Sequence, residues 1–283
     1  MNEEIPQYFK SLQDLITSRL ETIDGKQTFH QDSWLHKSGG GGRTRVLSEG
    51  AVFEKAGVSF SEVHGDKLPD SALEKLPDIT ENLGFSATGI SLIIHPLNPH
   101  VPTVHMNYRY FESGDTWWFG GGADLTPYYP YREDVIHFHR TLKNACDKSD
   151  ETYYPKFKKW CDEYFYIQHR DEPRGVGGIF FDHLSGSFNN IFSFVRDCGD
   201  NFLPAYEPIV IKRKDLSFNE SQREFQLYRR GRYVEFNLVY DRGTKFGLQT
   251  GGRIESILVS MPPLVKWKYD YQPEPGSREA ELY

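Results

Sequence analysis

The chain has 283 residues, a formal net charge of −7 and a content of 15% aromatic residues. That length is enough to bury a sizeable core in one α/β or α+β unit. A nucleic-acid-binding protein would be expected to show a basic excess or a basic stripe, and only short basic runs occur here, at 212–214 and 229–232. The charge therefore argues against a nucleic-acid partner, although basic groups could still gather in a site for an anionic small molecule.

The three cysteines, Cys146, Cys161 and Cys198, are odd in number and show no CxxC spacing. They do not indicate a disulfide framework or a structural zinc site, and they favour a reducing compartment. The N-terminus lacks the basic and apolar segments of a signal peptide and is too acidic for a transit peptide. No apolar run approaches the ~18 residues that a membrane span needs. We therefore expect a cytoplasmic protein without a transmembrane segment.

The first part of the chain is predicted to form a helix and then a loop. Apolar residues at spacings of three and four predict an amphipathic helix over residues 4–23. Four consecutive glycines at 39–42 predict a flexible loop over 38–45, and Arg43 and Arg45 favour a place for this loop near a ligand. The Lys-Ser/Thr that ends a P-loop is missing, which disfavours a nucleotide-binding protein.

In the rest of the chain, groups of strands are separated by groups of helices. The predicted strands are 46–61 (with turns at 49–50 and 56–57), 89–95, 103–111, 116–119, 175–182, 233–240 and 253–261. The predicted helices are 132–148, 156–170, 188–198 and 220–230, with a loop and a short helix in 66–84 and a frayed tail after residue 273. This order lacks the alternation of a Rossmann chain, and no GxGxxG occurs. We expect a single α+β domain over 1–283, with a large, mainly antiparallel sheet flanked by helices.

A polar row lies on one face of the predicted hairpin 89–111. Alternation along a strand puts His105, Asn107 and Arg109 on one side, and Ser91 and His95 share a side of the neighbouring strand. Such a row is too polar for a core, and strand faces that only meet water use Lys, Glu and Thr more often. The row offers a proton-transfer group, an amide and a guanidinium suited to a carboxylate. We therefore favour a binding or catalytic face over a merely solvated one.

Two further segments are candidates for chemistry. Asp124 follows the three glycines at 120–122, which would let a backbone approach a ligand closely, but a tight turn capped by Asp124 explains that segment equally well. The pair Asp241-Arg242 and the later Arg253 stand close to further glycines, and these arginines could hold carboxylates. A hairpin with turn glycines is the alternative there.

A metal site is a further hypothesis. The candidate ligands are His95, His105, His139 and His169. They could converge only through the tertiary fold, because no pair has the spacing of an HExxH motif. A metal-dependent hydrolase or dioxygenase that uses these four histidines therefore stays an alternative.

Taken together, these segments resemble the oxygen-dependent coproporphyrinogen oxidase family. The matching stretches run in order over roughly residues 35–270, and they are 41–45, 95–99, 102–109, 118–127, 158–162, 230–238 and 241–244. The resemblance implies that two propionates of coproporphyrinogen III become vinyl groups, giving protoporphyrinogen IX. Oxygen would be the acceptor, and carbon dioxide and hydrogen peroxide would be released. No flavin, haem or metal would be required, although a divalent cation remains an option.

The resemblance also implies roles for residues, position by position. His105 matches a proton donor, Asp241 and Arg242 match a pair that organises pyrrole N–H groups and a propionate, and Asp124 matches a further acidic candidate. The substrate-contacting positions are Ser91, Asn107, Tyr108, Arg109, Gly251, Gly252 and Arg253. The positions suggested as cation ligands in bacterial members are His95, His105, His139 and His169.

The substrate would be a flat, tetra-anionic molecule, and Arg43 and Arg45 would add positive charge around it. The family implies helices on both faces of the sheet and a homodimer formed through roughly 233–268. The competing class is a non-catalytic tetrapyrrole-binding protein, which would need the arginines but not His105 or the Asp241-Arg242 pair.

Overall fold

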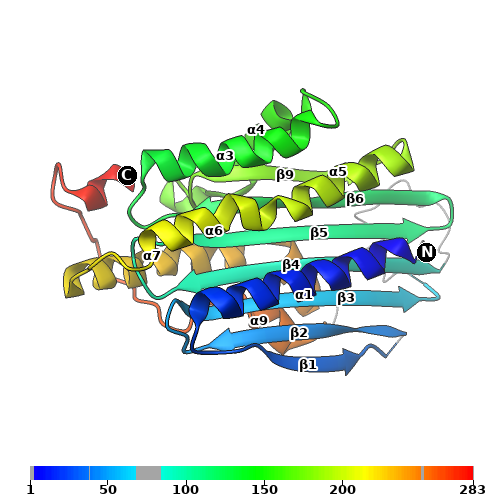
Figure 1. Cartoon of the computed structure of the whole chain (residues 1–283), viewed down its shortest axis with the longest axis horizontal. Coiled ribbons are helices and arrows are strands. Elements are labelled where there is room, and N and C mark those ends of the chain that lie inside the picture. Colours follow the sequence, from blue (N-terminus) through cyan, green and yellow to red (C-terminus); the bar gives the residue numbers. More distant parts are fainter. Residues whose placement is uncertain (1–2, 38, 68–83, 250–251, 283) are drawn as a thin grey trace.

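The computed structural model describes residues 3–37, 39–67, 84–249 and 252–282, and it confirms an α+β fold. Seven antiparallel strands form one sheet in the order β1-β2-β3-β4-β5-β6-β9, with helices on both faces (Figure 1). The strands of this sheet are β1 (His30–Leu35), β2 (Gly40–Ser48), β3 (Phe53–Gly65), β4 (Phe85–Pro96), β5 (Thr103–Ser113), β6 (Thr116–Thr126) and β9 (Gly177–Leu184). A small separate hairpin pairs β7 (Tyr166–Ile167) with β8 (Glu172–Pro173).

The helices lie in two layers. One face of the sheet, here called the first face, is covered by α1 (Glu4–Asp24), α3 (Arg132–Asp147), α5 (Phe188–Asp200) and α6 (Phe202–Arg213), as Figure 1 shows. The helix α4 (Tyr153–Tyr164) packs on β9 at the edge of the sheet. The C-terminal helices α7 (Glu220–Val239), α8 (Arg242–Gln249) and α9 (Ile254–Leu258) follow, and α7 and α9 lie behind the sheet in Figure 1. In the described part of the chain, no helix is long and apolar enough to cross a membrane.

The main core lies between the first face and its helices. Val104, Met106 and Tyr108 of β5 point into it and are fully buried, as are Phe9 and Ile16 of α1. This arrangement follows from the alternation of side chains along a strand, which sends every second residue to the same face. The intervening residues of β5 therefore point to the opposite face, here called the second face.

The second face is covered only in part. The segment around α9 closes it near β2–β4, where Ser256 Oγ lies 2.7 Å from Thr44 Oγ1 and Lys55 Nζ donates to the Met261 carbonyl at 2.8 Å. Further along β4 and β5, Ser91, Asn107 and Arg109 are only partly buried. The fold thus leaves this part of the predicted polar row accessible, whereas His95, at the end of the row, is fully buried and contacts the Ser260 carbonyl.

The predicted hairpin 89–111 is confirmed, but the strand after it is longer than expected. Six of the strands pair as neighbours along the chain, and the register places Ile93 opposite His105 and His105 opposite Asp124. The glycines at 120–122 lie inside β6 rather than in a turn. The turn predicted at 56–57 is also wrong, because β3 runs through it, whereas the turn after Ser48 is confirmed.

The flexible loop predicted over 38–45 is wrong for most of its length, because β2 begins at Gly40. The glycines are required by a close approach: a Cβ on Gly42 would lie 2.3 Å from the Trp34 ring, and one on Gly41 would lie 2.2 Å from the Trp34 carbonyl oxygen. Trp34 also donates from its indole nitrogen to Thr44 Oγ1 at 3.3 Å. The glycine run therefore lets an indole lie flat across a strand, and the nucleotide-loop alternative loses its basis.

The strands predicted at 233–240 and 253–261 are helical instead. Asn219 caps α7 through a capping box with Gln222, as expected, but the helix then continues to Val239. Three arginines of this helix are buried, Arg229, Arg230 and Arg232, while Leu238 and Val239 are each 49% exposed. In 233–240 the polar residues Glu235 and Asn237 alternate with apolar neighbours, which is the hydrophobic pattern of a strand. The loop and short helix predicted in 66–84 lie almost entirely outside the described residues.

The tail after residue 273 is packed rather than frayed. A short 3₁₀ helix covers Arg278–Leu282, and Tyr129 Oη donates to Glu279 Oε1 at 2.5 Å. The Arg278 guanidinium lies 5.2 Å and 4.8 Å from the rings of Tyr129 and Tyr131. These contacts hold the tail against the start of the α3 segment.

Candidate active site

His105, Asp124 and Arg174 form a hydrogen-bonded chain on the second face. His105 Nδ1 lies 2.9 Å from Asp124 Oδ1, and Asp124 Oδ2 accepts from Arg174 Nη2 at 2.7 Å. The first contact follows from the β5–β6 register, which sets the two residues opposite each other. The side chains of Asp124 and Arg174 are 3% and 2% exposed, whereas that of His105 is 25% exposed. Only the histidine end of the chain can therefore meet a ligand.

The charges in this chain stabilise one another. Burial opposes ionisation of Asp124, but Arg174 and His105 outweigh it and hold the pKa of the carboxyl below its ordinary value. Burial likewise disfavours the Arg174 cation, yet Asp124 and, more weakly, Asp241 raise its pKa. An ionised Asp124 accepts, so His105 Nδ1 carries the hydrogen and Nε2 is left as the atom that exchanges a proton with a ligand.

Arg174 was missed by the sequence analysis. Its guanidinium lies 3.9 Å from the Phe165 ring centre and 4.7 Å from that of Tyr233, and Nη1 donates to Asn237 Oδ1 at 3.2 Å. It comes from the segment between β8 and β9, some distance along the chain from Asp124, so no local spacing links the two. A lone arginine between Pro173 and Gly175 gave no periodic signal that could have revealed its buried partner.

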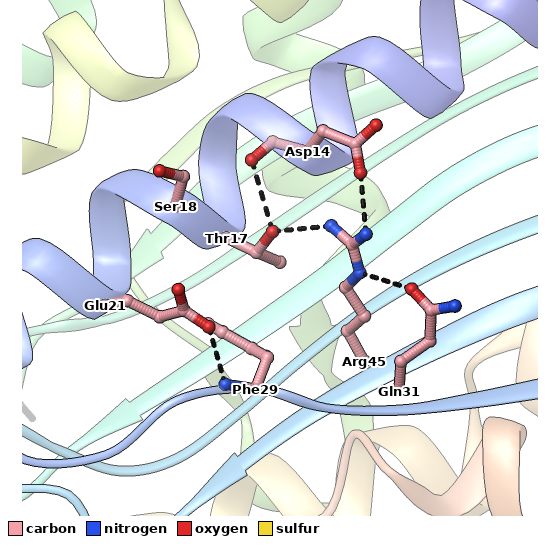
Figure 2. A pocket seen from close by; sticks show the side chains of 7 residues that line it. All are labelled: Asp14, Thr17, Ser18, Glu21, Phe29, Gln31 and Arg45. Atoms are coloured by element: carbon pink, nitrogen blue, oxygen red, sulfur yellow. Dashed lines mark hydrogen bonds and ion pairs between the residues drawn. The ribbon is translucent and has the colours of Figure 1, made fainter.

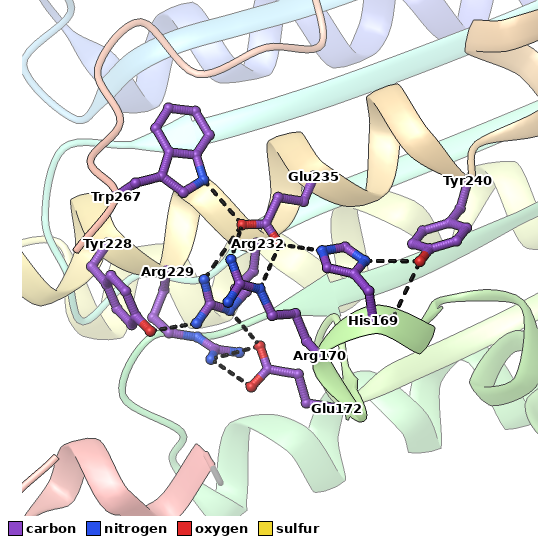
Figure 3. Close-up of polar contacts among 9 residues, drawn as sticks. All are labelled: His169, Arg170, Glu172, Tyr228, Arg229, Arg232, Glu235, Tyr240 and Trp267. Carbon is purple, nitrogen blue, oxygen red and sulfur yellow. Dashed lines mark hydrogen bonds and ion pairs between the residues drawn. The ribbon is translucent and has the colours of Figure 1, made fainter. Parts of the chain in front are cut away.

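A polar network fixes the hairpin that carries Arg174 (Figure 3). Glu172 accepts from Arg229 Nη1 at 3.0 Å and from Arg232 Nε at 2.9 Å, both on α7. Arg170 holds Glu235 of the same helix through two hydrogen bonds of 2.8 Å and 2.7 Å. The hairpin is thus joined to α7 at two points, through Glu172 and through Arg170. Paired hydrogen bonds between planar guanidinium and carboxylate groups fix its orientation on the helix. The position of Arg174 therefore depends on the C-terminal helix.

The predicted row of Ser91, Asn107 and Arg109 lies on the second face beside His105, as expected. Ser91 pairs with Asn107 in the β4–β5 register, and Asn107 Oδ1 accepts from Arg109 Nη1 at 3.0 Å. The Arg109 side chain is 34% exposed and forms an ion pair with Asp182 of β9. The structure thus brings a proton-transfer group and a partly exposed guanidinium to one surface, four residues apart along β5, where a ligand that spans this separation could meet both.

Tyr108, predicted to contact substrate, points the other way. Its side chain is fully buried in the core on the first face, and its ring stacks with Phe181 at 6.3 Å. The side chains of its neighbours Asn107 and Arg109 point to the second face, whereas that of Tyr108 does not. A side-chain contact between Tyr108 and a ligand on that face is therefore excluded by the alternation of the strand.

Arg43 and Arg45 also lie on the first face and are engaged with α1. Arg43 donates to Gln13 Oε1 at 2.6 Å, and Arg45 donates to Thr17 Oγ1 at 2.8 Å (Figure 2). Both form ion pairs with Asp14. The pocket in Figure 2, which Arg45 lines between α1 and β1–β2, is on the side of the sheet away from His105. The structure therefore does not bring these two arginines to the candidate site.

Asp241 caps the start of α8, so the hairpin with turn glycines, which was the alternative for this segment, is wrong. It accepts from the Thr244 backbone N–H at 2.7 Å and from Tyr164 Oη at 3.0 Å. The Arg242 guanidinium lies 5.4 Å from the Tyr164 ring centre. Tyr164 packs on Phe165, which in turn packs edge-to-face on His105 at 5.9 Å. The pair therefore borders the site, one aromatic layer from His105.

The remaining predicted contacts lie further away or outside the described residues. Arg253 precedes α9 and forms an ion pair with Asp32 of the edge strand β1, which is separated from β5 by β2, β3 and β4. Gly252 donates its N–H to the Gly247 carbonyl at 2.8 Å. Gly251 lies outside the residues that the structure describes. A substrate contact by Arg253 or Gly252 stays a prediction.

The four histidines do not converge on a metal site in this chain. His95 contacts Thr103 Oγ1 and the Ser260 carbonyl, His139 contacts Tyr154 Oη and the Val176 carbonyl, and His169 contacts Tyr240 Oη and Glu235. Burial lowers the pKa of both His95 and His139 below the ordinary value, so these rings are neutral. Over the described ranges, no three His, Cys, Asp or Glu side chains are grouped so that they could hold a metal ion. The residues present therefore do not fit a four-histidine cation site within one protomer.

The fold and the site define a class: an α+β protein whose open sheet face carries a histidine–carboxylate–arginine chain and a partly exposed arginine. The sequence model of the coproporphyrinogen III oxidase family matches residues 4–283. Two proteins of Prochlorococcus marinus, from strains NATL1A and NATL2A, bear the name oxygen-dependent coproporphyrinogen-III oxidase. Each is 54% identical to this chain, over 96% of the chain and 85% of the relative. The chain belongs to the coproporphyrinogen III oxidase family.

Proposed function

We propose that this chain is an oxidoreductase that converts coproporphyrinogen III to protoporphyrinogen IX, with oxygen as the acceptor, in porphyrin and haem biosynthesis. The family membership and the name shared by its 54% identical relatives support this activity. The structural observation that carries it is the placement of His105, backed by Asp124 and Arg174, on the same sheet face as Arg109. A proton-transfer group beside a carboxylate-binding group is what a propionate decarboxylation needs.

The chemistry balances without a bound redox group. Each propionate loses its carboxyl group as carbon dioxide and one β-hydrogen, leaving a vinyl group. The two electrons and the protons pass to oxygen, which becomes hydrogen peroxide. Arg109 would bind a propionate carboxylate, and His105 Nε2 would exchange a proton with the pyrrole or with reduced oxygen. The electron-rich porphyrinogen supplies the reducing power, so the protein acts through positioning and electrostatics.

We further propose that no metal or organic cofactor is needed, and one experiment tests this together with the activity. The purified protein is mixed with coproporphyrinogen III and air in a chelating buffer, and protoporphyrinogen and hydrogen peroxide are measured. We expect one hydrogen peroxide for each vinyl group formed, and no product under argon. Binding of the porphyrinogen without conversion would support the non-catalytic carrier instead, and activity restored only by a divalent cation would support the metal-dependent alternative.

A homodimer is the quaternary structure that we propose, formed through the C-terminal segment. Large apolar side chains are exposed there, among them Leu238, Ile254, Leu264 and Trp267, at 49–58% exposure each. A protein interface would cover such exposed apolar side chains. Sedimentation analysis should give about twice the monomer mass of 32.8 kDa, and Ile254→Asp should lower the dimer fraction. A monomer at all protein concentrations would contradict the proposal.

We propose a reducing compartment, such as the cytoplasm, as the location. The three cysteines are all unpaired and buried, so the fold uses them as thiols rather than as disulfides. Burial raises the pKa of Cys161 and Cys198 well above the ordinary thiol value, which suppresses their reaction with the peroxide that the proposed activity releases.

A further inference from the structure

The guanidinium of Arg109 is held in place by three other residues of the second face. Asp182 Oδ1 accepts from Arg109 Nη2 at 2.8 Å, and Asn107 Oδ1 accepts from Nη1 at 3.0 Å. The Arg109 Cζ atom lies 5.7 Å from the centre of the Trp118 ring. Neither Asp182 nor Trp118 was singled out as a site residue from the sequence.

Gly120 makes room for the Arg109–Asp182 pair. It is paired with Arg109 in the β5–β6 register, and a Cβ at this position would lie 2.6 Å from Asp182 Oδ1 and 3.0 Å from both Nε and Nη2 of Arg109. The ion pair therefore lies directly over the Cα of Gly120. A side chain there would push the guanidinium or the carboxylate away.

Asp182 is itself fixed in orientation. Its Oδ1 also accepts from the backbone N–H of His183 at 3.0 Å. His183 adopts a left-handed backbone with a φ of 49°, and its ring stacks on that of Trp118 at 4.6 Å. An L-residue with a side chain rarely adopts this backbone unless neighbouring contacts hold it there. The stack of His183 on Trp118 is such a contact, and it points the Asp182 carboxylate at Arg109.

We propose that Asp182 is a positioning residue for Arg109 and thereby sets the affinity for a carboxylate-bearing substrate. Arginine has five N–H donors, and Asp182 and Asn107 each take one in the structure, which leaves others for a ligand carboxylate. A guanidinium held in one orientation loses less conformational freedom when the ligand binds. The inference rests on the proposed function, because it assigns Arg109 to a propionate of that substrate.

Removing Asp182 also removes a negative charge from the neighbourhood of an anionic ligand, and this would favour binding. The two effects therefore have opposite signs on KM. Asp182 is only 13% exposed and its geometry is fixed from two sides, so we expect the loss of positioning to be the larger effect. Asp182→Asn removes the charge but keeps an oxygen acceptor, and it separates the two contributions.

The test compares Asp182→Ala and Asp182→Asn with the wild type in the porphyrinogen assay. We expect Asp182→Ala to raise KM about five- to tenfold with kcat changed less than about twofold, and Asp182→Asn to fall between Asp182→Ala and the wild type. Asp197→Ala is the matched control, because it breaks the Lys148 ion pair of 2.6 Å on the other side of the sheet, and KM should not change. A KM for Asp182→Ala at or below that of the wild type would overturn the proposal.

A double-mutant cycle separates positioning from a structural role. In an Arg109→Ala background, Asp182→Ala should no longer lower kcat/KM, because the positioning effect of Asp182 acts only through Arg109, and the loss of its negative charge can only favour an anionic ligand. Additive losses would show that Asp182 acts by another route and would overturn the inference. Gly120→Ala gives an independent readout, since it should raise KM in the wild type but not in Arg109→Ala. If the wild type itself did not convert coproporphyrinogen, the proposed function would be wrong. The inference about Asp182 is tested only by the differences between variants of an active protein, so the two failures can be told apart.

Discussion

Asp124→Asn is expected to lower both the stability and the turnover of the protein by large amounts. The substitution removes the negative partner of Arg174, whose side chain is 2% exposed, and leaves a buried cation. Removal of one partner of a buried ion pair costs about 3–5 kcal/mol. The contacts of Arg174 with Phe165, Tyr233 and Asn237 would remain and should keep the loss near the lower end.

The same change should reduce turnover by about 10²- to 10⁴-fold, which is the usual range for a group that supports a general acid or base. An amide can still accept from His105 Nδ1, but it cannot stabilise an imidazolium as a carboxylate does. The N–H donors of the introduced amide would also meet the donors of Arg174. Thermal unfolding and steady-state turnover on the same preparation give both quantities.

The matched control is Asp134→Asn. Asp134 pairs with Arg213 at 2.8 Å with both side chains 8% exposed, so it gives a buried pair away from the candidate site, in which Arg213 keeps Glu133 as a second partner at 2.6 Å. We expect this variant to lose stability but to keep the kcat of the wild type. If Asp124→Asn lost no more activity than Asp134→Asn, the effect would be structural, and Asp124 would leave the catalytic set.

Local patterns predicted β4, β5 and β9 well, but they missed β1 and the first half of β2, and they predicted the C-terminal helices poorly. The period of two is clear along β5 and the first part of β4, because one side of each strand faces the core and the other the polar row, and it ends at Ile93, from which β4 is buried on both sides. In α7 the pattern fails, since the helix buries Arg229, Arg230 and Arg232 through partners that lie far away in the sequence. Ion pairs formed by tertiary contact thus replaced the apolar stripe on which helix prediction depends.

Some residues of the candidate site were likewise predictable from local patterns, and others were not. Side-chain alternation placed His105, Asn107 and Arg109 on one face, and strand register then placed Asp124 opposite His105. Arg174 and Asp182 could not be found in this way, because each comes from a later segment and meets its partner only through the fold. Arg43 and Arg45 were predicted to lie near the site because glycines precede them. Their alternate positions in β2 instead direct both side chains to the first face, where they contact α1.

The glycine runs show how one sequence feature can have different causes. At Gly42 the missing Cβ admits the Trp34 ring beside β2, and at Gly120 it leaves space for an ion pair. Both are close approaches inside a strand, and neither is a loop or a turn. Composition alone could not distinguish these cases, because the group that fills the space comes from another strand.

His105→Ala is the second change with a large expected effect, and its signature differs from that of Asp124→Asn. His105 is 25% exposed and contributes little to the core, so we expect little change in the unfolding temperature. Turnover should fall about 10²- to 10⁴-fold, since the proton-transfer group at the accessible end of the hydrogen-bonded chain is lost. KM should change little, because the carboxylate contact belongs to Arg109.

The control for His105→Ala is His137→Ala. His137 is partly exposed on α3, and its Nε2 contacts the Pro204 carbonyl at 3.0 Å, on the first-face side of the molecule. Its removal should leave turnover at the level of the wild type. A pH profile of kcat completes the experiment: if His105 exchanges the proton, the pH dependence of kcat in the wild type should be lost in His105→Ala and kept in His137→Ala. If it persisted in both, another group would be exchanging the proton, and the chain from Arg174 through Asp124 would end at a residue without a catalytic role.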